Sequence, residues 1–359
     1  MARRRKERPP FSGGIAFGEL IAIFQPGVEH LVEERERKRT DLVVPGDADD
    51  DWEIDLDGRV ATLARSQPES ATPDADAGDA GTGDAGSAAS GDPVAAMKLT
   101  QVAPGVWTAT AATWATLTTV VVADDGACLV VDPGITVQEV GALAAEIGSR
   151  GWRPVAGFST HPHWDHVLWA PALGDVPRWA TAAAARTAGE SRSQILAEAD
   201  ADAPGHDHRF TAVLTPLPDG AGELPWDGPR AVVVPYRAHC PGSAALLLPG
   251  AGVLVAGDMF SDTEVPFLDL DAPDPVGDHH AALNRLQSVA DRHGVGVLVP
   301  GHGSVTDAAG LRRRLAADRA YLDALVVGAS MTDPRLADPW VAGEHERQVI
   351  WAGGGRRIG

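Results

Sequence analysis

Cysteine and long hydrophobic runs are scarce in this sequence of 359 residues. Its two cysteines, Cys128 and Cys240, provide no disulfide framework of the kind that stabilises small secreted domains. No apolar stretch reaches the roughly 18 residues of a membrane-spanning helix, which argues against membrane insertion. The longest N-terminal candidate, residues 15–24, contains Glu19 and is not followed by a small-residue cleavage site. We therefore expect a cytoplasmic protein.

Basic residues are also in short supply. Thirty lysines and arginines face 50 aspartates and glutamates, which gives a formal net charge of −20. Nucleic acids and anionic membranes are bound largely through lysine and arginine side chains that neutralise phosphates, so neither is expected as the main partner. The hydrophobic fraction of 44% is ordinary for a chain with a packed core, which excludes wholesale disorder.

The charge pattern divides the chain into three parts. Residues 1–65 are predicted to form a short helical module. Residues 15–39 are expected to be helical with a break at Pro26-Gly27, and residues 29–39 carry mixed charges at the i,i+4 spacing of a solvated helix. Residues 66–96 consist mainly of Ala, Gly, Asp, Ser, Thr and Pro and cannot bury enough apolar surface to offset their ordering entropy. We predict a disordered acidic linker there, followed by one large domain over residues 97–359.

The first part resembles a short, uncharacterised bacterial domain that often stands alone. The resemblance rests on Gly18-Glu-Leu, Pro26-Gly27, Glu29-His30, Glu33-Glu34 and Arg37-Lys-Arg39. It implies no known chemistry. A docking or peripheral membrane role for residues 15–24 is the alternative to a solvated tail.

Residues 97–359 alternate between β-rich and helical patterns. Strands are expected at 102–109, 117–123, 128–131, 155–159, 231–235, 244–248, 252–256 and 295–299, and helices at 137–148, 182–199, 278–293 and 308–325. Strand hairpins followed by alternating helices and strands indicate a layered α/β architecture.

A histidine cluster follows the predicted strand 155–159. The run Thr160-His-Pro-His-Trp-Asp-His166 places three histidines and one aspartate within six positions. Packed imidazoles pay a desolvation cost and repel one another when charged. Neutral imidazoles and carboxylates are, however, preferred ligands of zinc and similar ions. His161 and His163 can face one centre, while Asp165 and His166 begin the next turn and can face a second.

The His-x-His-x-Asp-His motif resembles the signature of the metallo-β-lactamase superfamily, whose other motifs follow in order. They are matched by Asp132 in Val-Asp-Pro-Gly, His239 in Ala-His-Cys-Pro-Gly-Ser, Asp258 in Ala-Gly-Asp and His302 in Pro-Gly-His-Gly. The resemblance implies a four-layer αβ/βα sandwich with the site at one edge. It also implies a ligand set: His161, His163 and His239 for a first cation, Asp165, His166 and His302 for a second, Asp258 between them, and Asp132 supporting a ligand from behind.

The family resemblance also implies a reaction. Two divalent cations, expected to be Zn²⁺ with Fe or Mn as alternatives, would share a hydroxide that attacks an ester, thioester or lactone. Asp165 and Asp258 would be the catalytic carboxylates, with Asp165 orienting the hydroxide. An aspartate at position 258 resembles the glyoxalase II-like and lactonase-like branches, although the glutathione-binding pattern of glyoxalase II is not found. The expected partner is a small acyl substrate; the oligomeric state stays open.

Four aromatic side chains are candidates for the substrate pocket: Trp114, Trp164, Tyr236 and Phe260. Packing in the core is an equally good interpretation of each. Tyr236 could also donate a hydrogen bond to the developing oxyanion. Cys240 follows a ligand but points away from the metal if the local chain is extended, so we do not assign it to the centre.

Three rival interpretations stay open. The strongest is a mononuclear iron oxygenase resembling the persulfide dioxygenases, which share the fold. A nuclease of the ribonuclease Z type would need a basic groove, whereas residues 97–359 carry a net charge of −11. In the third, the N-terminal module is the functional part and the sandwich only carries it. Retention of hydrolysis after deletion of residues 1–96 would argue against this last interpretation.

Overall fold

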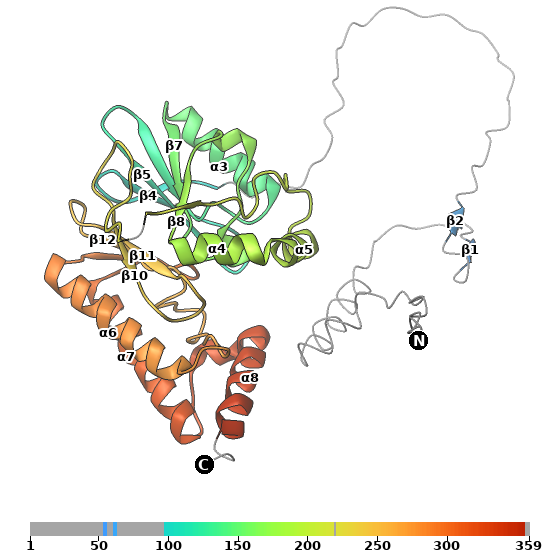
Figure 1. Ribbon diagram of the computed structural model, residues 1–359, viewed down its shortest axis with the longest axis vertical. Coiled ribbons are helices and arrows are strands. Elements are labelled where there is room, and N and C mark those ends of the chain that lie inside the picture. The colour runs from blue at the N-terminus through green and yellow to red at the C-terminus, as the bar shows by residue number, and fades with distance from the viewer. Residues whose placement is uncertain (1–52, 56–59, 63–96, 219, 356–359) are drawn as a thin grey trace, which may run out of the picture. The chain divides into compact units, whose positions relative to one another are not determined.

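The computed structural model describes residues 53–55, 60–62, 97–218 and 220–355 (Figure 1). The chain divides into two units, Met1–Gly86 and Ser87–Gly359. In the first unit, the described residues are two short antiparallel strands, β1 (Glu53–Asp55) and β2 (Val60–Thr62). The helix predicted within residues 15–39 and the linker predicted over 66–96 lie outside the described residues.

A seven-stranded sheet begins the second unit, with its strands in chain order. They are β3 (Thr100–Ala103), β4 (Val106–Thr110), β5 (Leu117–Val122), β6 (Ala127–Val131), β7 (Arg153–Phe158), β8 (Arg178–Ala180) and β9 (Thr215–Pro216). Strands β3 to β6 pair antiparallel, and β6 to β9 pair parallel. The single strand predicted over 102–109 is in fact a hairpin, because Gly105 at φ 70° turns the chain between β3 and β4.

A five-stranded sheet follows, again in chain order. Its strands are β10 (Val232–Pro235), β11 (Ala244–Leu248), β12 (Val253–Val255), β13 (Val297–Val299) and β14 (Thr306–Asp307). Only the β12–β13 pair is parallel, and the long helix α6 (Pro275–His293) makes the crossover between these two strands.

Helices cover the outer face of each sheet. The first sheet carries α3 (Val137–Ser149), α4 (Ala182–Glu190) and α5 (Arg192–Asp202), and the second carries α6 and α7 (Ala308–Val327), with α8 (Pro339–Gly355) beside α7 (Figure 1). The structure thus confirms a layered αβ/βα fold. The helix predicted over 182–199 is divided at Ser191, and α8 was not predicted.

Period-two alternation along the strands explains the layers. In β6, Leu129 and Val131 lie in the core between the two sheets, whereas Cys128 and Val130 lie under α3. In β11, Leu246 and Leu248 face the same inter-sheet core, and Leu247 packs under α6 and α7. Both strands are buried throughout, which is expected when both faces of a sheet are covered.

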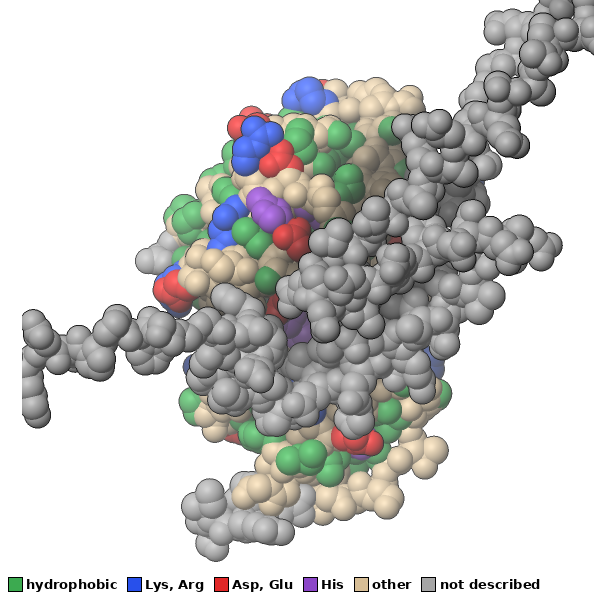
Figure 2. Space-filling model, turned by 90° about the vertical axis from the view of Figure 1, so that its right-hand side faces the viewer, with side chains coloured by type: hydrophobic (Ala, Val, Ile, Leu, Met, Phe, Trp, Pro, Cys, Tyr) green, Lys and Arg blue, Asp and Glu red, His purple; other side chains and the backbone are tan. Residues whose placement is uncertain are grey.

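Two features of the structure agree with the scarcity of long hydrophobic runs and of basic residues in the sequence. None of the described helices is long and apolar enough to cross a membrane. On the face drawn in Figure 2, the coloured basic side chains are few, and several lie next to acidic ones.

One buried histidine makes the stability of this fold sensitive to acid. His279 of α6 is 1% exposed, and burial lowers its pKa to about 3, with smaller contributions from His239 and His280. Between pH 6.5 and 3 the unfolded chain therefore binds a proton that the folded chain excludes. We expect the free energy of unfolding to fall by about 1.4 kcal/mol per pH unit from this residue as the pH drops below about 6.5.

Urea unfolding of chelator-treated protein between pH 7 and pH 4 measures this effect. His279→Gln is expected to show a slope shallower by that amount, while His293→Gln, an exposed histidine of the same helix, keeps the wild-type slope. Equal slopes for all three proteins would contradict the assignment.

Candidate metal centre

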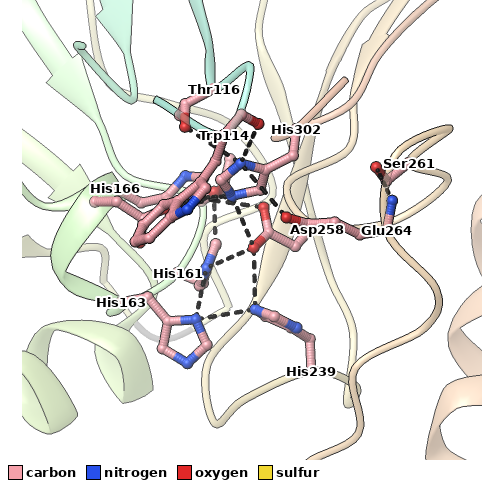
Figure 3. Close-up of polar contacts among 12 residues, drawn as sticks. Trp114, Thr116, His161, His163, His166, His239, Asp258, Ser261, Glu264 and His302 are labelled. Carbon is pink, nitrogen blue, oxygen red and sulfur yellow. Dashed lines mark hydrogen bonds and ion pairs between the residues drawn. The ribbon is translucent and has the colours of Figure 1, made fainter. Parts of the chain in front are cut away.

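The predicted ligands meet where loops from the two sheets face each other (Figure 3). His161, His163 and His166 follow β7, whereas His239, Asp258 and His302 follow β10, β12 and β13. Backbone hydrogen bonds join the two sides. The Leu117 amide donates to the Gly301 carbonyl at 2.7 Å, and the Gly303 amide donates to the Ala115 carbonyl at 3.1 Å.

Three imidazole nitrogens form the first group of donor atoms. His163 Nδ1 lies 3.1 Å from His161 Nε2 and 3.0 Å from His239 Nε2. Ligands about 2.0–2.1 Å from one zinc ion lie roughly this close to one another. His161 is fully buried, whereas His163 is exposed at the mouth of the site.

The second group joins a carboxylate and two imidazoles. Asp165 Oδ2 lies 3.3 Å from His166 Nε2 and 3.2 Å from His302 Nε2, and these two nitrogens are 3.3 Å apart. All three side chains are buried. Mixed imidazole and carboxylate donors suit zinc, iron and manganese.

Asp258 lies between the two groups. Its Oδ2 is 3.4 Å from His161 Nε2 and 3.1 Å from His239 Nε2, and its Oδ1 is 3.3 Å from His166 Nε2. Oδ1 is buried and has no hydrogen-bond partner among the described residues. A buried carboxylate oxygen without a donor is costly unless a cation is present, so this donor set fits metal binding.

Asp132 lies behind the predicted ligands and contacts two residues of the histidine motif. Its carboxylate accepts hydrogen bonds from the Thr160 amide and hydroxyl and faces His166 Nδ1 at 3.0 Å. Thr160 Oγ1 in turn lies 3.0 Å from His161 Nδ1. When Nδ1 of each histidine donates its proton to these oxygens, Nε2 has a lone pair available for a cation.

Electrostatics favour charge separation in the metal-free centre. Burial disfavours a charged Asp258, but the surrounding histidines, His166 first, outweigh it and hold the pKa of that carboxyl well below its usual range. Conversely, burial opposes charge on His166 and His302, yet the facing carboxylates, led by Asp258, hold the pKa of both imidazoles well above the usual range. A cation would displace those protons, so its affinity is expected to fall at low pH.

Backbone strain is concentrated around this centre. Asp132, His239 and Phe260 adopt positive φ values of 47°, 66° and 62°, although none is glycine. Such conformations cost about 1–3 kcal/mol each and persist where the surrounding structure enforces them. The strain at His239 has a direct consequence for its neighbour.

Cys240 is closer to the ligands than predicted. Its amide donates to the Ala238 carbonyl at 2.7 Å, which makes a γ-turn centred on His239 rather than an extended segment. The turn brings Cys240 Sγ within 4.8 Å of the ligand nitrogens of His161, His163 and His239. Burial raises the pKa of this thiol to about 12 in the metal-free state. The expectation that it points away is therefore wrong.

Glu264 is a residue of the centre that was not predicted from the sequence. This buried carboxyl lies near Asp258 and 3.9 Å from His302 Nδ1, and burial raises its pKa to about 7. Its position in a loop six residues after Asp258 follows no periodic pattern, so only the folded loop reveals it.

The four candidate pocket residues fall into two pairs. Trp114 and Trp164 lie beside the centre, with their rings 5.5 Å apart and the Trp114 ring 6.5 Å from that of His302. Tyr236 and Phe260 instead belong to the core under α6 and α7. The Tyr236 hydroxyl donates to the Ala256 carbonyl at 2.8 Å, so it is engaged in holding the fold rather than facing an oxyanion.

Gly301 leaves room for the Asp258 carboxylate. A Cβ atom at this position would lie 2.0 Å from Asp258 Oδ1 and 3.1 Å from His166 Cε1. Gly301→Ala must therefore move the carboxylate, and we expect a loss of about 10- to 100-fold in cation affinity, the range found when ligands lose their support. Metal titration against a chromophoric chelator measures the loss. Gly250→Ala, where a Cβ would meet nothing within 4 Å, is the control, and equal affinities would refute the argument.

Comparison with known proteins agrees with the geometry. The family model of the metallo-beta-lactamase superfamily matches residues 112–306, more than half of the chain, so this protein belongs to that superfamily. Residues 23–63 match a family of unknown function, DUF6191. The search of curated proteins gives no match.

Solved structures of the same fold are similar to this chain. A beta-lactamase domain protein from Burkholderia ambifaria is 22% identical with a TM-score of 0.50, over 67% of this chain and 78% of its own. The DIM-1 metallo-beta-lactamase is 17% identical with a TM-score of 0.46, over 64% of this chain and 99% of its own. A metallo-beta-lactamase from Pontibacter korlensis is 20% identical with a TM-score of 0.44, over 62% and 98%. At these identities the comparison shows a similar fold and nothing about function.

Proposed function

We propose that this protein is a dinuclear metal-dependent hydrolase that cleaves an ester, thioester or lactone of a small acyl substrate. The observation that carries the proposal is the convergence of five imidazoles and two carboxylates in two adjoining groups of donor atoms. No ligand position of the family pattern is replaced by a side chain that cannot bind a cation.

The residues of the centre would have different roles. His161, His163 and His239 would hold one cation and Asp165, His166 and His302 the other. Asp258, whose oxygens lie near imidazole nitrogens of both groups, would contribute to each. When bound, two such cations lower the pKa of a water molecule and polarise a carbonyl group. The Asp165 carboxylate, fixed between His166 and His302, would accept a hydrogen bond from the attacking water and orient it. Asp132 and Thr160 keep the imidazoles in the required tautomers.

The net charge of the domain favours a small substrate over a nucleic acid. Residues 97–359 carry a net charge of −11, so a nucleic acid backbone would find few partners. We further propose Zn²⁺ as the bound ion, because imidazole and carboxylate ligands in this number suit it.

A metal count combined with a substrate panel tests the proposal. We expect about two ions per chain, and hydrolysis of aryl esters, thioesters or lactones that chelator treatment abolishes and Zn²⁺ restores. Full activity after complete removal of metal would contradict it. One iron per chain together with oxygen consumption would favour the mononuclear oxygenase instead.

A further inference from the structure

Three tryptophans from distant parts of the chain gather beside His302. Trp114 lies in the loop between β4 and β5, Trp164 begins the turn that carries Asp165, and Trp340 is the second residue of α8. The Trp114 ring stacks on Trp340 with centroids 5.8 Å apart and planes 14° apart. It meets the Trp164 ring at 5.5 Å and 68°, edge to face.

Trp114 is the most exposed of the three tryptophans. It is 37% exposed, whereas Trp340 is partly buried and Trp164 is 7% exposed. An exposed indole on a protein surface is unremarkable when it stands alone, but here it adjoins a cluster of convergent polar groups. Apolar walls beside a few placed polar groups are the usual composition of a small-molecule site.

The Trp114 indole is fixed to the centre through its own backbone. Trp114 and Ala115 adopt φ values of 53° and 51°, and the Trp114 carbonyl lies 3.2 Å from His302 Nδ1. The contacts of the ring with Trp340 and Trp164 restrict its side-chain torsions, so it has little freedom to lose on contact with a ligand. Rigid aromatic groups give affinity at low entropic cost.

Trp340, which stacks on Trp114, lies outside the residues that match the family model. The superfamily model ends at residue 306, so α8 belongs to the part of the chain beyond it. Phe267 contacts the Trp340 ring edge to face at 5.1 Å. The stacking partner of Trp114 therefore lies in a C-terminal segment outside the residues that match the family model.

We propose that Trp114, backed by Trp340, forms a subsite for an apolar, preferably aromatic, acyl group, so that the enzyme prefers arylacyl esters to acetyl esters. This inference rests on the proposed hydrolytic function and names the class of its substrate. The subsite lies on the His302 side of the centre, because the Trp114 ring centroid is 6.5 Å from that of His302.

The test compares 4-nitrophenyl phenylacetate with 4-nitrophenyl acetate, using the full chain reconstituted with Zn²⁺. The wild type is expected to prefer the phenylacetate in kcat/KM, and Trp114→Ala to lower that preference about tenfold, the effect of losing one aromatic contact. Trp340→Ala is expected to lower it about threefold, because the indole of Trp114 loses its backing. Trp351→Ala, a half-exposed tryptophan farther along the same helix, keeps the wild-type preference.

Using the ratio of two esters cancels any general loss of metal or stability, since both substrates suffer it equally. If Trp114→Ala does not fold, Trp340→Ala carries the comparison. An unchanged preference in the folded variants would overturn the subsite.

A binding measurement separates this inference from the proposed function. Phenylacetate, titrated by calorimetry, is expected to bind the Zn²⁺-loaded wild type more tightly than acetate does, and about tenfold more tightly than it binds Trp114→Ala. That result in a protein that hydrolyses no ester would overturn the hydrolase proposal and support the subsite. Equal binding to wild type and variant, with ester hydrolysis intact, would overturn the subsite alone.

Discussion

Replacing Asp258 with asparagine is expected to lower cation affinity by more than about 100-fold, and hydrolysis with it. Loss of a group that merely supports a ligand costs about 10- to 100-fold, and Asp258 is itself within 3.5 Å of ligand nitrogens from both groups. The substitution also removes the negative charge that interacts with the imidazoles of the centre. An amide carries no negative charge. Its NH₂ group would donate hydrogen bonds to the imidazole lone pairs that would otherwise bind the cation.

Metal titration and ester hydrolysis on the same samples measure the effect. Asp271→Asn makes the same chemical change on an exposed loop residue and should retain wild-type affinity. Thermal unfolding without metal shows whether the variant folds. A folded Asp258→Asn protein with wild-type affinity for two ions would remove this residue from the centre.

Four of the predicted ligands stand out in the sequence because each lies three or four residues after the end of a short apolar strand. Local alternation predicts the strand, and the residue that follows it must emerge at the sheet edge. His161, Asp258 and His302 all satisfy this rule, following β7, β12 and β13. The structure brings their donor atoms together with those of His239, the ligand that follows β10.

The surroundings of the ligands could not be found in this way. Glu264 and Cys240 reach the centre through loop conformations, a γ-turn in one case, that no periodic pattern encodes. Trp340 reaches it only because α8 packs on α7 across tertiary contacts. Such contacts depend on the whole fold rather than on nearby sequence.

Some elements of secondary structure could not be predicted from the sequence for related reasons. Strands β9 and β14 have two residues each, too few for an alternation to be visible. Helix α8 contains Gly343 and ends in three glycines, residues that disfavour helix in isolation. It is stabilised by tertiary contacts instead, among them Gln348 Nε2 donating to the Tyr321 hydroxyl at 3.1 Å.

Arg335→Met is expected to lower the free energy of unfolding by about 3–5 kcal/mol. Arg335 is 5% exposed in its side chain and Asp318 is 3% exposed, and their charged atoms lie 2.6 Å apart. Burial already raises the pKa of Asp318 to about 6 against the pull of the guanidinium. Without Arg335 the carboxylate is left buried and unpaired, which is the costly way to break such a pair. The guanidinium also donates to the carbonyls of Ser261 and Glu264, in the loop that follows Asp258.

Urea unfolding of chelator-treated variants isolates the effect from metal binding. The double variant Arg335→Met, Asp318→Leu is expected to recover part of the loss, because the buried Asp318 charge is gone. Asp333, whose Oδ2 lies 2.8 Å from the Arg335 guanidinium, loses its partner in both variants. Arg347→Met removes an exposed arginine whose partner, Glu344, lies three residues before it, and should cost less than about 1 kcal/mol.

The pH dependence gives a second check with a definite sign. Asp318 of the single variant, with Arg335 gone, takes up its proton at a higher pH than in the wild type, and protonation removes the unpaired charge. The destabilisation by Arg335→Met should therefore be smaller at pH 5 than at pH 8. A loss that is the same at both pH values, and that the double variant does not relieve, would mean that Arg335 acts through packing and its backbone hydrogen bonds rather than through its charge.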